Sequence, residues 1–256
     1  MLDPTKRFSS RVENYVSYRP RYPAKVLITL QQECGLTAAS VIADVGSGTG
    51  FLSELFLDNG NPVFAIEPNL EMRVAGEQSL DNRRRFTSID GTAEKTTLPS
   101  QSVDFVVAGQ AFHWFDRLQA KREFARILKP TGWVMLVWND RDTASTPFLV
   151  AYEQLIKEFS PGYGQINHKQ IDEAVLSDFF SPSQIYTSSA RYSQTFDYEG
   201  LKGRMLSSSY VPEVGQPNHQ EMVVKLAEIF REYSVGDRVQ FKYITRMFYS
   251  QIAKWP

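Results

Sequence analysis

Residues 41–50 read Val-Ile-Ala-Asp-Val-Gly-Ser-Gly-Thr-Gly, and this stretch decides the fold. The apolar and β-branched residues at 41–45 are typical of a buried parallel strand, although Asp44 carries a carboxylate that is costly to bury without partners. Glycines follow at 46, 48 and 50, and from Phe51 onward apolar residues recur with helical spacing. A strand, a glycine turn and a helix bring backbone close to a nucleotide-like ligand, so the stretch predicts a binding site at the end of the strand.

The spacing of the glycines separates two kinds of nucleotide site. A dinucleotide fingerprint has the form Gly-x-Gly-x-x-Gly. After Gly46 and Gly48 this form requires a third glycine at position 51, where the chain has Phe51. The spacing therefore disfavours a Rossmann dehydrogenase.

Composition and charge are those of an ordinary folded protein. The chain has 256 residues, 42% hydrophobic and 22% charged, with a formal net charge of −1. This length suits one large domain, or one domain with a cap. The charge gives no overall attraction to nucleic acid or to an anionic membrane, and we expect Arg83-Arg84-Arg85 to be a solvated face.

Cysteine content and hydropathy bear on the compartment. The single cysteine, Cys34, excludes an intramolecular disulfide and cysteine-based metal clusters. No apolar stretch approaches the roughly 20 residues of a membrane span, and the N-terminus lacks the apolar core of a signal peptide. We therefore expect a cytoplasmic enzyme without a metal, a nucleic-acid partner or a membrane; the oligomeric state stays open.

Strand-like and helix-like segments alternate along the first part of the chain. Such alternation predicts a parallel, doubly wound sheet. Two late segments alternate in polarity and predict an antiparallel pair at the sheet edge. We expect Gly35 and Asn69 to cap helices, 129–132 to form a turn, and Pro161, Gly162 and Gly164 to mark a loop. The predicted strands lie at 41–45, 63–66, 86–89, 102–108, 133–138, 188–196 and 239–245.

The predicted fold class is α/β, a Rossmann-like doubly wound seven-stranded sheet, mostly parallel with an antiparallel last strand, covered by a helical cap. No linker rich in Gly, Ser or Pro divides the chain, so residues 1–256 are expected to form a single domain. Its core comprises about 36–142 with late strands at about 186–197 and 238–252, and the cap is inserted at about 143–184 and 198–236.

Residues that follow the strands deserve most weight, because ligands bind at the carboxyl ends of the strands in such sheets. The glycine turn and the helix start after it suit an anionic group such as a carboxylate. Glu67 follows the second strand, 17 residues after Gly50, where a carboxylate can accept both hydroxyls of a ribose. Further polar and aromatic residues follow the third, fourth and fifth strands, at 90–94, 109–115 and 138–142.

Several motifs together carry a resemblance to a known family. They are the Asp-x-Gly-x-Gly-x-Gly turn, a Tyr-x-x-Tyr-Arg-Pro-x-Tyr-Pro run at 15–23, Ala-Phe-His-Trp at 111–114, Leu-Lys-Pro-x-Gly at 128–132 and Trp-Asn-x-Arg-Asp at 138–142. From about residue 8 to 142 the chain resembles class I S-adenosylmethionine-dependent methyltransferases of the methyltransferase type 11 branch. It is most similar to the subset that includes trans-aconitate methyltransferase-like proteins.

The resemblance implies a cofactor, S-adenosyl-L-methionine, and methyl transfer by in-line displacement to a small-molecule acceptor, with a carboxylate or hydroxyl favoured. Many family members have Asp-Ala-Glu where this chain has Thr92-Ala93-Glu94, so Asp90 or the Thr92 hydroxyl could bind the adenine amine. The implied cofactor-binding residues are Asp44, Gly46, Ser47, Gly48, Glu67, Pro68, Asp90, Thr92, Ala93, Glu94 and Gln110.

The acceptor side is less specific. His113 is the candidate general base, with packing beside Trp114 as an equal alternative. Residues 8–23 are expected to form a lid over the pocket, and Arg19, Arg21 and Arg141 could pair with an acidic acceptor. The candidate substrate-binding residues are Tyr15, Tyr18, Arg19, Tyr22, Trp114, Asn139, Arg141 and Tyr210. Two alternatives stay open, an RNA or protein methyltransferase and a non-catalytic S-adenosylmethionine-binding protein.

Overall fold

The computed structural model describes residues 12–160, 163 and 171–251. The predicted loop residues Pro161, Gly162 and Gly164 lie outside the described residues, as do residues 8–11 of the predicted lid and residue 252 of the last predicted strand. Within the described part, no helix is both long and apolar enough to cross a membrane.

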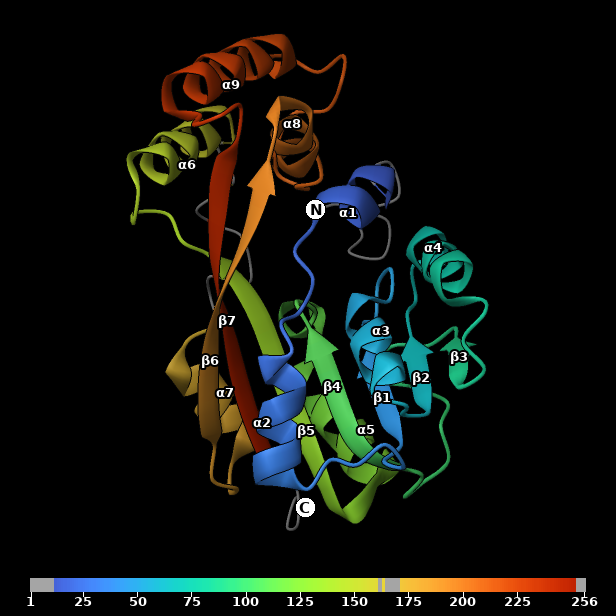
Figure 1. Ribbon diagram of the computed structural model, residues 1–256. Helices are drawn as coiled ribbons and strands as arrows, with labels where there is room; N and C mark the ends of the chain where they lie inside the picture. Colours follow the sequence, from blue (N-terminus) through green and yellow to red (C-terminus); the bar gives the residue numbers. More distant parts are fainter. Residues whose placement is uncertain (1–11, 161–162, 164–170, 252–256) are drawn as a thin grey trace.

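One seven-stranded sheet organises the molecule, with the strand order β3-β2-β1-β4-β5-β7-β6 (Figure 1). Strands β1 to β5 pair in parallel, whereas β7 runs antiparallel to both of its neighbours. The predicted sheet is confirmed, including its antiparallel last strand. The strands are β1 Ile42–Val45, β2 Val63–Ile66, β3 Phe86–Ile89, β4 Val103–Gly109, β5 Leu128–Arg141, β6 Tyr186–Phe196 and β7 Val239–Gln251.

Helices cover both faces of the sheet, because successive side chains of a strand point to opposite faces. In β1, Ile42 packs with α2 and α3, while Ala43 and Val45 belong to the opposite cluster with α5. The helices that flank the sheet are α2 Lys25–Cys34, α3 Phe51–Asp58, α4 Leu70–Leu80, α5 Arg117–Ile127 and α7 Glu173–Phe180.

Two helix ends follow the local rules that the sequence indicates. Gly35 ends α2 in the left-handed conformation, with φ 71°, which costs glycine little. The Asn69 side chain accepts a hydrogen bond from the Met72 backbone N–H at 2.8 Å and so begins α4. Both predicted caps are confirmed.

A second, smaller hydrophobic cluster forms the cap. It joins α6 Pro147–Phe159, α8 Tyr198–Leu206 and α9 His219–Tyr233 with the first half of β7. Figure 1 shows these three helices gathered at the top, with β6 and β7 extending up to them from the sheet. Phe241 and Tyr243 of β7 lie in the cap cluster, whereas Met247 and Tyr249 lie in the sheet core. One long strand pair therefore connects the two halves.

The sequence placed all of residues 143–184 in the cap, but part of this segment belongs to the core. Helix α6 packs against α9, whereas α7 packs against α5 on the sheet. Leu176, Phe179 and Phe180 of α7 are buried in the main core, and the Phe179 ring lies 4.6 Å from that of Phe112. The apolar face of α7 is covered by the sheet side, so this helix returns to the core.

The predicted turn at 129–132 is part of a strand. Strand β5 begins at Leu128, opposite Val103, and its register against β4 shifts between Val103 and Phe105. The Lys129 ammonium binds both oxygens of Asp104 on β4, at 2.8 and 2.9 Å. Because this contact holds the segment along β4, the extra residues form an irregularity in the ladder.

Candidate active site

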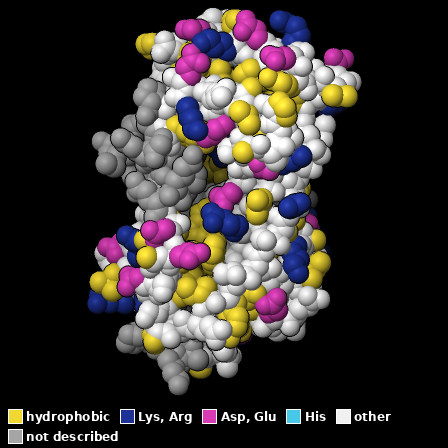
Figure 2. Space-filling model, turned by 90° about the vertical axis from the view of Figure 1, so that its left-hand side faces the viewer, with side chains coloured by type: hydrophobic (Ala, Val, Ile, Leu, Met, Phe, Trp, Pro, Cys, Tyr) yellow, Lys and Arg dark blue, Asp and Glu magenta, His cyan; other side chains and the backbone are white. Residues whose placement is uncertain are grey.

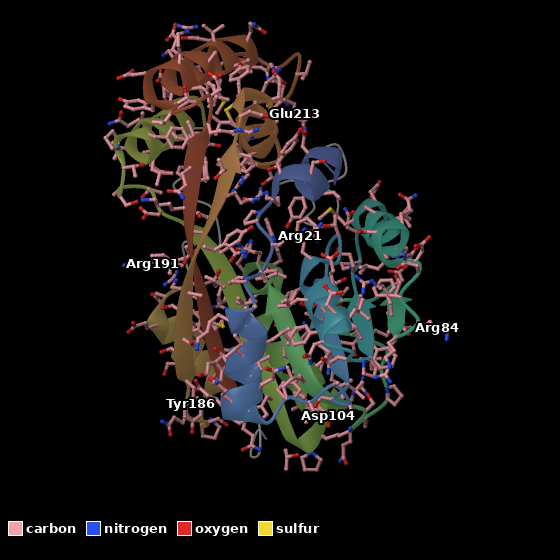
Figure 3. All side chains as sticks on the ribbon, viewed as in Figure 1. Arg21, Arg84, Asp104, Tyr186, Arg191 and Glu213 are labelled. Atoms are coloured by element: carbon pink, nitrogen blue, oxygen red, sulfur yellow. The ribbon has the colours of Figure 1, made fainter. Side chains whose placement is uncertain are left out.

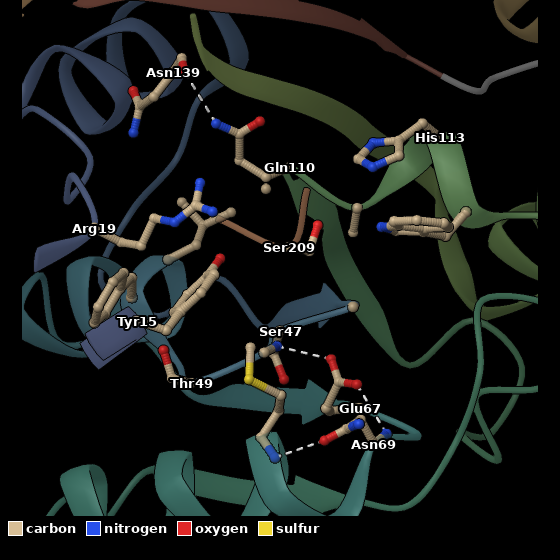
Figure 4. A pocket seen from close by; sticks show the side chains of 18 of the residues that line it. Tyr15, Arg19, Ser47, Thr49, Glu67, Asn69, Gln110, His113, Asn139 and Ser209 are labelled. Carbon is tan, nitrogen blue, oxygen red and sulfur yellow. Dashed lines mark hydrogen bonds between the residues drawn. The ribbon is translucent and has the colours of Figure 1, made fainter. Parts of the chain in front are cut away.

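A cavity of about 660 Å³ lies between the carboxyl ends of the strands and the cap. Residues that follow β1 to β5 line one side, and residues from α8 and the N-terminal segment line the other. Figure 2 shows the surface hollowed between the cap and the lower part of the molecule, and Figure 4 shows the pocket from close by. This is the edge at which ligands bind in open α/β sheets.

The glycine turn brings backbone to the cavity wall. Gly46, Gly48 and Gly50 have φ angles of 70°, 57° and 85°, which glycine adopts at little cost. A Cβ on Gly46 would lie 2.5 Å from the Ala111 Cβ, so no larger residue fits. The turn therefore leaves backbone, and not side chains, facing a ligand at the start of α3.

Glu67 is fixed beside this turn by two backbone groups. Its carboxylate accepts hydrogen bonds from the Gly48 N–H at 2.8 Å and the Asn69 N–H at 2.9 Å (Figure 4). Burial raises the pKa of Glu67, and the hydrogen bonds from Asn69 and Gly48 oppose that rise. Each carboxylate oxygen keeps a lone pair for a further donor, as two adjacent hydroxyl groups would require.

Asp44 and Thr49 contribute buried polar atoms that still lack partners within the described part of the chain. Ser53 donates to one oxygen of Asp44 at 2.7 Å, while the other oxygen of Asp44 and the Thr49 hydroxyl have no hydrogen bond. Burial raises the pKa of Asp44 to about 7, against hydrogen bonds from Ser53. Such atoms are expensive to bury unpaired, which points to a polar ligand group at the turn.

Four cofactor-binding residues were predicted after β3, and three of them, Thr92, Ala93 and Glu94, line the cavity. Asp90 does not: its carboxylate lies 3.2 Å from the Arg73 guanidinium, and its side chain is 74% exposed. The proposed contact of Asp90 with the adenine is therefore not supported, and Thr92 remains the candidate of the two.

Comparisons with known proteins find similar chains among methyltransferases. Residues 43–136 match the family described as the methyltransferase domain. An uncharacterised methyltransferase of Schizosaccharomyces pombe is 28% identical over 268 residues, which span 96% of this chain and 97% of that one. An uncharacterised methyltransferase of Mycobacterium bovis is 37% identical over 140 residues, and the alignment covers about half of each chain, 55%.

The fold agrees as well. A solved structure from Anaeromyxobacter dehalogenans, assigned as a type II methyltransferase, has a TM-score of 0.71 over 93% of this chain and 100% of that one, at 19% identity. The chain is a class I methyltransferase. Its cofactor is S-adenosylmethionine. The unpaired Asp44 oxygen suits an ammonium group, Glu67 a ribose, and the helix start beyond the glycine turn a carboxylate.

The ends of β4 and β5 meet at Gln110 and Asn139 of the methyltransferase. Gln110 has a φ of 58°, unusual for a residue with a side chain, and it donates to the Asn139 carbonyl at 3.1 Å. The Asn139 amide donates to the Arg21 carbonyl at 3.3 Å and accepts from Thr245 at 2.6 Å. Both residues line the cavity, and Asn139 also ties the N-terminal segment to the sheet.

His113 lies on a short helical turn, η3 Phe112–Trp114, directly after β4. Its ring faces the cavity and lies 4.7 Å from that of Trp114, which also lines the cavity. The methyltransferase thus places His113 where the sequence predicts, and the packing beside Trp114 is present too. Both expected roles remain compatible with this position.

The N-terminal segment joins the two walls. Tyr22 is seated against the sheet, since a Cβ on Gly109 would lie 2.3 Å from its hydroxyl. Tyr18 is seated in the cap, since a Cβ on Gly203 of α8 would lie 2.1 Å from its ring. Tyr15 and Tyr22 line the cavity, whereas Tyr18 does not, which disagrees with its predicted contact to the acceptor.

The three arginines named from the sequence have different surroundings. Arg21 pairs with Glu54 at the surface, away from the cavity. Arg141 lines the cavity and is neutralised by Glu153; it also donates to the Tyr163 hydroxyl at 2.7 Å. Arg19 reaches into the cavity beside Tyr15 (Figure 4).

Sequence reasoning missed Arg204 of α8, which lines the cavity together with Ser209 and the predicted Tyr210. Burial alone raises the pKa of Tyr210, but the charges of Arg141, Arg204 and Arg19 outweigh it and lower that pKa. No motif marks Arg204, because its place in the site depends on how the cap folds back over the sheet.

Proposed function

We propose that the methyltransferase acts on a small-molecule acceptor, with a carboxylate or hydroxyl oxygen as the nucleophile. The observation that supports this is the cavity of about 660 Å³, which continues from the glycine turn to arginine and tyrosine side chains of the cap. Because α1 (Val12–Tyr18) packs on α8 over this space, a small ligand fits it better than a folded macromolecule. The further similarity to trans-aconitate methyltransferases stays a prediction.

The positions of the lining residues support the roles that we propose for them. When bound, S-adenosylmethionine would supply an activated methyl group to a nucleophilic oxygen of the acceptor, with S-adenosylhomocysteine as the leaving group. Glu67 and Asp44 hold the ribose and ammonium ends, and Tyr15 and Tyr22 cover the pocket against water. His113 takes the proton of a hydroxyl acceptor, whereas a carboxylate acceptor needs no base.

The surface of the methyltransferase favours a small acceptor over RNA. Of the Arg83-Arg84-Arg85 run, Arg83 pairs with Asp58 at 2.7 Å and Arg85 donates to the Gly60 carbonyl at 2.6 Å. Figure 3 shows Arg84 extending outward alone from the sheet edge. On the face in Figure 2, basic and acidic side chains are interspersed, so that face offers no track for a phosphate backbone.

Two measurements test the proposal. Calorimetry with S-adenosylhomocysteine should show one saturable site on the wild-type protein, and its absence from folded protein would remove the basis of the proposal. Transfer of a labelled methyl group should then be followed with panels of small carboxylic acids and hydroxy compounds, with RNA and protein extracts as the other arms. Labelling of RNA or protein alone would overturn the small-molecule assignment.

His113 is tested separately with the substitution His113→Asn. If His113 is the base, kcat with hydroxyl acceptors falls about 10²-fold, within the usual contribution of a general base. The Kd of S-adenosylhomocysteine and turnover of carboxylate acceptors should stay near wild type. Equal losses with both acceptor classes would assign His113 a packing role beside Trp114.

A further inference from the structure

Two arginines that line the cavity, Arg204 and Arg19, have no acidic partner among the described residues; Arg204 is buried and Arg19 is half-buried. Arg204 on α8 is 4% exposed, and among the described residues its hydrogen-bond partners are hydroxyl groups: Tyr243 at 3.0 Å, Ser207 at 3.4 Å and Ser208 at 3.3 Å. Within the described ranges, no carboxylate pairs with it. A buried cation bonded only to neutral groups is costly, since hydroxyls do not neutralise the charge.

Arg19 lies beside Arg204. Its guanidinium donates to the Ser207 carbonyl at 2.9 Å, so Ser207 contacts both arginines. The Arg19 Nε is enclosed and has no hydrogen-bond partner among the described residues. Burial and the charge of Arg204 lower the pKa of Arg19, as expected for two like charges that face each other.

Arg141 provides the contrast within the same cavity. Its charge is neutralised by Glu153, which is equally buried, with 8% of each side chain exposed. The fold therefore supplies a carboxylate to Arg141 and, in the described part of the chain, none to Arg19 or Arg204. Arg19 and Arg204 both line the cavity that reaches the glycine turn.

We propose that Arg19 and Arg204 together form a subsite for a carboxylate of the acceptor, and that this carboxylate anchors the acceptor while a second group is methylated. The inference rests on the proposed function, because it takes the cavity to hold the acceptor. Guanidinium groups bind carboxylates through paired N–H donors. An oxygen whose lone pairs are held in this way is a poor nucleophile, so the reacting oxygen is a different one.

The geometry leaves room for that second group. Figure 4 shows His113 on the opposite side of the pocket from Arg19, with Gln110 between them. An acceptor held by its carboxylate at the arginines can therefore extend across the pocket towards His113. The acceptor class is a small organic acid with a hydroxyl or a second carboxyl group.

Calorimetry on protein saturated with S-adenosylhomocysteine tests the subsite. The probes are glutarate, 4-hydroxybutyrate and 4-hydroxybenzoate, each with its neutral amide as the matched compound. At least one acid should bind saturably while its amide does not. Arg204→Met and Arg19→Met should each weaken that binding about ten- to hundredfold, the range for loss of one hydrogen-bonded charge.

Controls separate this subsite from a general effect on folding. Arg191→Met removes an arginine that is exposed on β6 and points away from the molecule, and it should leave acid binding unchanged (Figure 3). Arg204→Lys retains the charge and should restore part of the affinity. Each variant must still bind S-adenosylhomocysteine, which shows that it is folded. If Arg204→Met does not bind it, Arg204→Lys takes the place of that variant in the comparison.

The outcomes are decisive in both directions. Binding of an acid that depends on Arg19 and Arg204 supports the subsite, even if the labelled-methyl assay finds no small acceptor and the proposed function fails. If no acid binds the wild-type protein, or if acids and amides bind alike, the subsite is overturned. Methylation of neutral acceptors with unchanged KM in Arg204→Met would overturn it while leaving the proposed function standing.

Discussion

The two walls of the cavity carry opposite charge and have different origins in the chain. The sheet wall presents carboxylates, Asp44 and Glu67, held by backbone N–H groups or hydroxyls at consecutive strand ends. The cap wall presents the guanidinium groups of Arg19 and Arg204, and Arg141 at the end of β5 reaches Glu153 of the cap helix α6. Such a division suits a cofactor with ammonium and ribose groups on one side and an organic acid on the other.

The difference teaches how each wall is built. On the sheet wall, a polar side chain meets backbone groups of the adjacent loop, so its position follows from the strand order. On the cap wall, each arginine meets groups that are near it only because α6, α8 and the N-terminal segment pack together. One wall is defined by motifs, and the other by tertiary packing.

The largest expected effect concerns Arg141, the neutralised arginine that joins the end of β5 to the cap helix α6. Arg141→Met leaves Glu153 buried without its guanidinium partner, so we expect the free energy of unfolding to fall by about 3–5 kcal/mol. Urea unfolding followed by tryptophan fluorescence measures this loss. The double variant Arg141→Met/Glu153→Gln should recover most of the stability. A single variant as stable as wild type would show that Arg141 and Glu153 are not coupled, and the contrast with Arg204 would disappear.

The second effect is on the sheet wall. Glu67→Ala removes the ribose acceptor and leaves the Gly48 and Asn69 N–H groups unpaired. We expect about 3 kcal/mol of lost binding, which is roughly a 10²-fold higher Kd for S-adenosylhomocysteine by calorimetry. Glu94→Ala, at the end of another strand on the same wall, should have a smaller effect. Unchanged affinity in Glu67→Ala would refute the ribose role.

The third effect tests whether the N-terminal segment joins the walls. Gly203→Ala places a methyl group against the Tyr18 ring, and overpacking of this kind costs about 1–3 kcal/mol. We expect about a tenfold higher KM for the acceptor with the Kd of S-adenosylhomocysteine near wild type. In a Tyr18→Ala background, Gly203→Ala should add little further loss. An equal effect in both backgrounds would show that Tyr18 is not held at Gly203.

The smallest effect is a pH dependence on the sheet wall. The pKa of Asp44 is raised to about 7 in the cofactor-free protein, and the ammonium group of the cofactor favours its ionised form. The affinity for S-adenosylhomocysteine should therefore rise about tenfold between about pH 6 and about pH 8. Asp44→Asn should bind more weakly and without this dependence, as calorimetry across the range would show. A steep pH dependence that persists in Asp44→Asn would assign it to another group.

The same shift has a consequence for stability. Because the folded pKa of Asp44 lies above its ordinary value of 3.8, the folded state holds this proton more tightly than the unfolded state. The contribution of Asp44 to the free energy of unfolding is therefore present at low pH and is lost as pH rises towards about 7. Cofactor binding should reduce this loss.

Sequence and structure agree best where the local rules are strongest. The strands of the sheet, the caps at Gly35 and Asn69 and the turn at 46–50 were all predictable, because each depends on the conformational preferences of a few neighbouring residues. The turn expected at 129–132 failed because Lys129 finds Asp104 on a neighbouring strand. Helix α7 was misplaced because its apolar face fits the sheet side and the cap equally well as a pattern.

The candidate site divides in the same way. The sequence by itself predicted the cofactor wall except for Asp90, since the carboxyl ends of the parallel strands β1 to β4 lie at one edge of the sheet. Only the tertiary structure decided which charges of the cap wall are left for a ligand. A guanidinium is neutralised by whichever carboxylate the packing brings within reach: Glu153 reaches Arg141, whereas within the described residues Arg204 hydrogen-bonds to hydroxyl groups alone.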